Sequence, residues 1–113
     1  MDNIKLKGLD NFDKVEKSIV EEISIKGYDK ILRDMKNAIM IIHPKKYDIQ
    51  GNKTRFLIYA RVEVAESLIS HAEASSWELQ KAMHMIINKL ENGIQHKFKT
   101  KGKRIQTSNI VED

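Results

Sequence analysis

The sequence predicts an α+β fold, a two-layer β-α-β-β-β-α sandwich in which two helices cover one face of a four-stranded mixed sheet. Four short stretches show the alternation, or the compact apolar run, that is typical of strands. Two longer stretches repeat apolar residues every three or four positions, as amphipathic helices do. With 113 residues, 41% of them hydrophobic, the chain has the size of one domain. We expect this domain to span residues 1–104, followed by a flexible tail at 105–113.

The first strand is expected in residues 4–9, where apolar Ile4 and Leu6 alternate with lysines. Asp10 and Asn11 interrupt this alternation. They are expected to supply capping side chains for the helix that follows.

From residue 13 the period changes, and Val15, Ile19 and Ile23 recur four positions apart, which predicts a helix over residues 13–35. Gly27 leaves two alternatives. Either the helix continues through this glycine at a cost of about 1 kcal/mol relative to alanine, or it ends there and a short second turn follows. We favour one helix that is bent or weakened at Gly27.

The second strand is expected in residues 37–43, a compact apolar run that Pro44 closes. A run this short and this rich in β-branched residues is typical of a buried central strand. Residues 45–52 are polar and contain a Gly-Asn turn signal, so we expect a loop there.

Two further strands are expected in residues 54–64 and 67–74. The turn between them, near Ala65 and Glu66, lacks the glycine or asparagine that such turns favour. In the first of these strands the apolar face consists of Phe56, Ile58, Ala60, Val62 and Val64. Its other face carries Arg55, Leu57, Tyr59, Arg61 and Glu63.

The last helix is expected to begin with a capping box formed by Ser75 and Glu78 and to end near Gly102. Its apolar stripe comprises Leu79, Met83, Ile86, Leu90 and Ile94, with Ala82 and Ile87 beside it. The three consecutive strands are expected to form an antiparallel meander, and a right-handed crossover through the first helix places the first strand parallel to the second. The sheet face that bears Arg55, Tyr59 and Arg61 is then open to water or to a partner.

Basic residues are concentrated near the end of the chain, although the net charge is only +4. Residues 96–104 hold five of the 20 basic residues and no acid, and the other 15 nearly balance the 16 acidic residues. Such a run suits a phosphate-rich partner, and Phe98 within it suits stacking on a base. The alternative is a solvated helix end whose lysines suit the helix dipole. The predicted RNA-binding residues are Lys81, Lys89, Lys97, Lys99, Lys101, Lys103, Arg104, Lys45, Lys46, Lys30 and Arg33.

The residue types give no sign of catalysis. The absence of cysteine excludes disulfides, thiolate metal sites and a cysteine nucleophile. The four histidines, at positions 43, 71, 84 and 96, lack the spacing of metal ligands. We expect a protein that is not an enzyme and that takes no cofactor or metal. With no signal peptide and no long apolar run, we also expect a cytoplasmic location and no membrane partner.

Two stretches carry a resemblance to a known family. Residues 82–91, AMHMIINKLE, resemble the A-I-D-x-x-I-D-K-L-E run of the ribosome hibernation-promoting factor and ribosome-associated translation inhibitor family (sigma-54 modulation type), with His84 and Asn88 in place of its acids. Residues 70–74 are similar to that family's R-A-E-A strand. The predicted order of elements is also the family's. The resemblance implies a short-form stress-response protein that binds small-subunit rRNA in the mRNA–tRNA channel through basic residues. Such a protein inhibits translation by blocking the decoding sites, and it protects idle ribosomes.

Two other functions fit the same residues. One is a stand-alone RNA-binding module resembling a double-stranded RNA-binding domain. The other is a self-associating structural protein, a homodimer through the open sheet face with Leu57, Tyr59 and Ile69.

Overall fold

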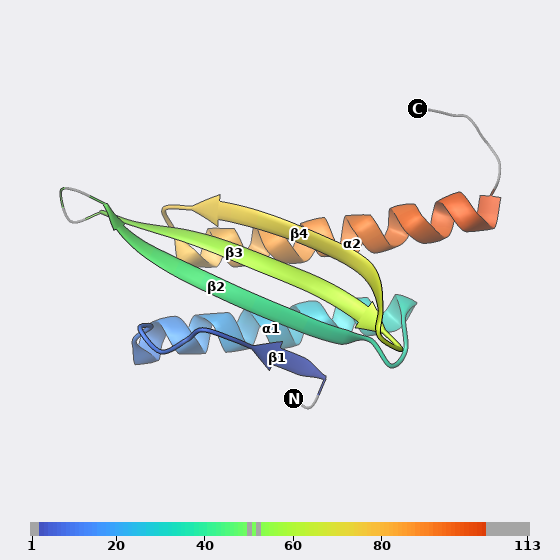
Figure 1. Ribbon diagram of the computed structural model, residues 1–113, viewed down its shortest axis with the longest axis horizontal. Helices are drawn as coiled ribbons and strands as arrows, with labels where there is room; N and C mark the ends of the chain where they lie inside the picture. The colour runs from blue at the N-terminus through green and yellow to red at the C-terminus, as the bar shows by residue number, and fades with distance from the viewer. Residues whose placement is uncertain (1–2, 50, 52, 104–113) are drawn as a thin grey trace.

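The computed structural model describes residues 3–49, 51 and 53–103, and it confirms the predicted α+β fold. The elements follow the order β-α-β-β-β-α (Figure 1). Their bounds are β1 Ile4–Leu6, α1 Lys14–Asp34, β2 Ile39–Ile49, β3 Lys53–Val64, β4 Ser67–Ser76 and α2 Leu79–Lys103. The predicted tail at 105–113 lies outside the described residues.

The sheet has the predicted mixed topology. Its strands lie in the order β1-β2-β3-β4, with β1 parallel to β2 and the other two pairs antiparallel. Both helices lie behind the sheet, side by side (Figure 1). No helix in the described part of the chain is long and apolar enough to cross a membrane.

The core lies between the helices and one face of the sheet. Alternate residues of β3, from Phe56 to Val62, are buried there, as are Met40 and Ile42 of β2. The predicted stripe of α2 is confirmed, because all seven of its residues are at most 6% exposed. The opposite sheet face is uncovered.

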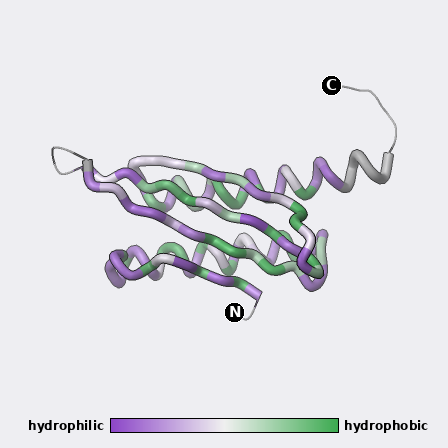
Figure 2. Tube along the Cα trace, in the orientation of Figure 1, coloured by the Kyte–Doolittle hydropathy of each residue, from purple (hydrophilic) through white to green (hydrophobic). Residues whose placement is uncertain are grey.

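The predicted end of the second strand at Pro44 is wrong, and so is the loop predicted for residues 45–52. Strand β2 continues through Pro44 to Ile49, and its register with β3 is unbroken from Ile39↔Glu63 to Ile49↔Lys53. The strand changes from hydrophobic to hydrophilic at its middle (Figure 2), which is why the second half resembles a loop in sequence.

Strand β2 tolerates Pro44 because of where β1 stops. The Met40 amide donates to the Asn3 carbonyl, and the Ile42 carbonyl accepts from the Lys7 amide, so alternate residues of β2 direct their backbone groups toward β1. Pro44 is next in this alternation, where β1 has already ended at Leu6. Its missing N–H therefore costs no bond to β3.

Both helix starts differ from the prediction. Helix α1 is capped by Asp13, not by Asp10 or Asn11: the Asp13 carboxylate accepts from the Glu16 amide at 2.8 Å, and Glu16 accepts from the Asp13 amide at 2.9 Å. The capping box predicted at Ser75 is absent, because Ser75 is still in β4 and its hydroxyl accepts from Arg55. The Ser76 hydroxyl accepts from the Glu78 amide instead.

Helix α1 is continuous through Gly27, which has a packing role. Gly27 is buried, and a Cβ atom added there would lie 2.5 Å from Cδ1 of Ile87 in α2. Gly93 has the same role between α2 and β4, where an added Cβ would meet the Ser70 hydroxyl. That hydroxyl donates to the Leu90 carbonyl. Both glycines thus lie where α2 approaches a neighbouring element too closely for an added Cβ atom.

The turn between β3 and β4 uses residues that are poorly suited to it. Val64 pairs with Ser67, so Ala65 and Glu66 form a two-residue hairpin loop. Both have positive φ, 52° and 66°. Side chains other than glycine and asparagine rarely adopt this region, so the loop is strained.

Candidate nucleic-acid interface

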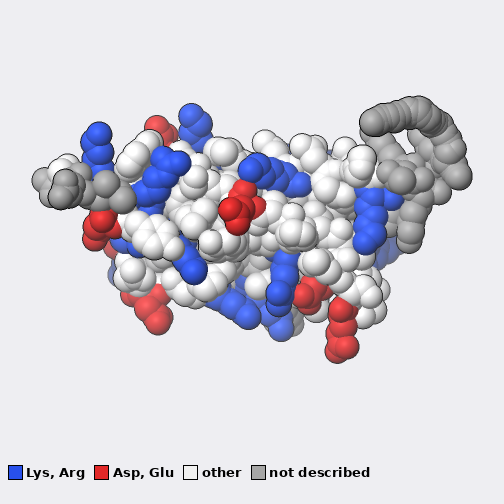
Figure 3. All heavy atoms as spheres, turned by 45° about the horizontal axis from the view of Figure 1, so that its top comes forward, with Lys and Arg blue, Asp and Glu red and all other residues white. Residues whose placement is uncertain are grey.

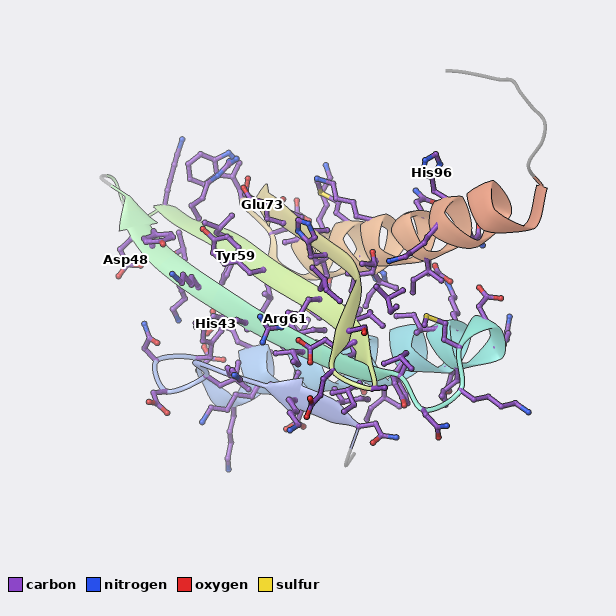
Figure 4. The ribbon with its side chains drawn as sticks, turned by 45° about the vertical axis from the view of Figure 1, so that its right-hand side comes forward. His43, Asp48, Tyr59, Arg61, Glu73 and His96 are labelled. Carbon is purple, nitrogen blue, oxygen red and sulfur yellow. The ribbon has the colours of Figure 1, made fainter. Side chains whose placement is uncertain are left out.

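The open face of the sheet carries the odd-numbered side chains of β2 and β3 in rows, together with those of β4 from His71 to Ser75. Before His71 a register shift places Leu68 of β4 opposite Glu63. Strand pairing places Tyr47 opposite Arg55, and places Tyr59 between His43 and Glu73. The next row crosses from Ile41 through Arg61 to His71. Figure 4 shows His43, Tyr59, Arg61 and Glu73 close together over the middle of the strands.

Cations and aromatic rings alternate across this face. The Lys45 ammonium lies 5.2 Å from the centre of the Tyr59 ring. The Arg55 guanidinium lies 4.8 Å from the centre of the Trp77 ring, and the Lys53 ammonium lies 5.8 Å from it. Such contacts orient the charged groups without neutralising them. The rings are still accessible, since Tyr47, Tyr59 and Trp77 are 45%, 38% and 50% exposed.

Positive charge dominates the face. The alternation assigns six cations to it, namely Lys5, Lys7, Lys45, Lys53, Arg55 and Arg61. Only two acids, Glu63 and Glu73, belong to it, and Glu63 is paired with Arg61 at 2.9 Å. Lys and Arg side chains are spread along the length of the visible surface (Figure 3). The open face is therefore a second concentration of positive charge, in addition to the basic run that the sequence shows near its end.

An open hollow of about 580 Å³ lies over the middle of the face, lined by Lys7, His43, Tyr59, Arg61, His71 and Glu73 among others. A smaller one of about 280 Å³ lies beside Trp77, Lys53 and Thr54. In the described residues no group of three or more histidines and acids could hold a metal ion. His43 packs its ring against Gly8, where an added Cβ would lie 2.6 Å from Nε2.

The predicted cations of α2 lie in different environments along the helix. Lys89 and Lys97 reach back to the edge strand β4, where their ammonium groups donate to the carbonyls of Glu73 at 2.9 Å and Leu68 at 3.4 Å. Lys81 is exposed on the first part of the helix. His96 points away from the sheet (Figure 4).

The basic end of α2 extends past the sheet. Ile94 is buried against the sheet, and Gln95, His96 and Lys97 after it are exposed or half-buried. The ribbon continues beyond the strands to Lys103 (Figure 1). Residues 99, 101 and 103, all lysines, belong to this helical extension. Arg104 lies outside the described residues.

The other four predicted cations do not lie together. Lys45 faces the open side of the sheet, whereas Lys46 faces the helices and binds the Glu16 carboxylate at 2.8 Å. Lys46 also lies 5.3 Å from the centre of the Phe12 ring. Lys30 and Arg33 are exposed on α1. The eleven predicted residues thus occupy several surfaces.

Sequence reasoning placed Arg55 and Arg61 on the open face but did not identify the other cations there as part of a binding surface. The sequence predicts Lys5 and Lys7 on the water-facing side of the first strand and Trp77 within the start of the last helix, and it assigns no role to Lys53. The pairing of β2 with β3 beyond Pro44 brings Tyr47 and Lys45 beside them, and no sequence signal predicted that pairing. No known family model matches the chain, and no curated protein matches its sequence.

Proposed function

We propose that this protein binds structured RNA through α2 and that its partner is the rRNA of the small ribosomal subunit. In this proposal it occupies the channel for mRNA and tRNA and inhibits translation as a hibernation factor. The observation that carries the proposal is the basic helical end of α2, which extends beyond the sheet. The family resemblance of residues 82–91, within the same helix, supplies the identity of the RNA.

The chemistry of this end suits phosphate groups. Lysines at 99, 101 and 103 stand on the part of the helix that continues past Ile94, the buried residue closest to this end among those whose burial is described. Cations near a helix C-terminus also suit the helix dipole, which helps to keep the end helical. Affinity would come mainly from counterion release and would fall steeply with salt.

Lys81 adds an exposed cation on the first part of the same helix. Lys89 and Lys97 are held on β4 carbonyls, so they contribute charge from fixed positions at the sheet edge. Contacts of this kind recognise the shape and backbone of RNA rather than base edges.

Co-sedimentation with purified small subunits tests the proposal. The wild type is expected to pellet with subunits at low salt and to be released at high salt. A triple substitution, Lys99→Gln, Lys101→Gln and Lys103→Gln, is expected to weaken binding and to lower the slope of log Kobs against log[salt] by about 2. The matched control is Lys14→Gln, Lys17→Gln and Lys26→Gln on α1, which removes equal charge and should leave binding unchanged.

Absence of co-sedimentation at every salt concentration would refute the proposal. Equal weakening by both triple variants would show that only net charge matters. Binding to naked duplex RNA that small subunits do not compete away would favour a stand-alone RNA-binding module instead.

A further inference from the structure

We propose that the open face of the sheet is a second binding surface, which takes single-stranded RNA by stacking its bases on Tyr59 and Trp77. This surface is distinct from the basic end of α2 and does not depend on it. Proteins that bind single strands combine cations that follow the backbone with aromatic rings on which bases stack. The open face has both.

The rings are presented for stacking. Trp77 and Tyr59 are 50% and 38% exposed on the uncovered side of the sheet. Each borders a hollow, of about 280 Å³ for Trp77 and about 580 Å³ for Tyr59. A base that enters either hollow meets a ring and at least one cation.

The cations are held in place beside these rings. Arg55 is fixed twice, because its Nη2 donates to the Ser75 hydroxyl at 3.0 Å while its guanidinium lies over Trp77. Lys45 lies over Tyr59. Neither group has a carboxylate partner within 4.0 Å in the described residues. Their charges are therefore available to phosphates. Because the fold already holds the Arg55 side chain in one position, RNA binding would not have to order it.

Charge decides between RNA and a second copy of the chain. In a twofold dimer through this face, its six cations would approach the same six of the partner, with only two acids on each side to compensate. Like charges brought together across an interface disfavour it. A polyanion with flat bases complements the surface, whereas duplex RNA would hide its bases from the rings.

Fluorescence gives a direct test, since Trp77 is the only tryptophan of the chain. A 12-nucleotide oligouridylate is expected to quench Trp77 emission. In anisotropy with the labelled oligonucleotide, Tyr59→Leu and Trp77→Leu should each weaken binding by roughly 5- to 100-fold. Tyr59→Phe and Trp77→Phe keep a ring and should bind nearly as the wild type does.

Charge variants complete the test. Lys45→Gln and Arg55→Gln should each lower the salt slope by about 0.7, the value for single strands, while Lys26→Gln on α1 should not. The triple glutamine variant of the α2 end should still show quenching of Trp77. Loss of small-subunit binding in that variant, with oligouridylate binding intact, would separate the two surfaces.

Three results would overturn the inference. One is equal binding by Tyr59→Leu and the wild type. Another is that duplex RNA or inorganic polyphosphate binds as tightly as oligouridylate and that Tyr59→Leu weakens its binding by the same factor. That result would show attraction by charge without stacking. The third is light scattering that gives twice the chain mass together with no effect of oligouridylate on Trp77, which would identify the face as a self-association surface.

Discussion

Lys45 and Lys46 are adjacent in the sequence and have different roles in the structure. Because β2 passes through Pro44 as a strand, the two side chains lie on opposite sides of the sheet. Lys46 joins Glu16, which also closes the capping box of α1, so it ties the second half of β2 to the helix start. Lys45 lies over Tyr59 on the open face. The sequence predicts both lysines as RNA-binding residues, whereas the strand places only Lys45 on the open face.

Gly27 carries a prediction at this scale. Gly27→Ala is expected to lower the free energy of unfolding by about 1 kcal/mol, although alanine favours a helix by about that amount. The reason is steric, because three carbon atoms of Ile87 would lie within 2.9 Å of the new Cβ. Ile87 is branched at Cβ and buried, so it has little room to move. Urea denaturation at equilibrium measures the change.

The control for this prediction is a second background in which Gly27→Ala is expected to raise, not lower, the free energy of unfolding. In an Ile87→Ala background the obstruction is gone, and Gly27→Ala should then stabilise the protein by up to about 1 kcal/mol through helix propensity. A stabilising effect of Gly27→Ala in the otherwise unchanged chain would contradict the close approach of α1 and α2.

At the scale of elements, the sequence predicted which strands and helices exist better than where they end. The stripe of α2 was predictable because its period persists over many turns and one side of it is buried without exception. The end of β2 was not predictable, because a proline normally closes a strand. Strand β2 accommodates Pro44 only because β1, which is three residues long, has already ended beside it. The start of α2 was missed because Ser75 serves Arg55, a partner 20 positions away.

The β3–β4 hairpin carries the prediction for an element. Replacing the loop by Ala65→Asn with Glu66→Gly should raise the free energy of unfolding by about 1–2 kcal/mol, since these residue types accept the positive φ values of both positions. The register Val64↔Ser67 requires a two-residue loop, so the new residues keep the strands paired as they are. Thermal and urea denaturation report the gain.

Ala65→Pro provides the opposite test of that turn. Proline fixes φ near −65°, which the loop cannot use at this position, so the variant should lose stability. Equal stability of the proline variant and the Asn-Gly variant would mean that the loop does not hold the left-handed conformation.

In the whole molecule, the two faces of the sheet divide stability from binding. One face and both helices form the core, while the other face keeps its cations and rings in the open. The sequence predicted this division, with Arg55, Tyr59 and Arg61 assigned to the open side. It did not predict Lys45 and Tyr47 beside them, or Trp77 under Arg55, because those neighbours meet only through pairing of distant strands.

The same division predicts that the end of α2 is dispensable for folding. A chain that stops after residue 97 keeps all the residues of α2 that are described as buried, from Leu79 to Ile94, and the Lys97 contact to Leu68. Its free energy of unfolding should fall by less than about 1 kcal/mol, because no described core contact is removed.

Ile94→Ala in the full chain should lower the free energy of unfolding by about 2–5 kcal/mol, because it opens a cavity between α2 and the sheet. Urea denaturation compares the two, and a loss from truncation as large as that from Ile94→Ala would mean that residues 98–113 stabilise the fold themselves.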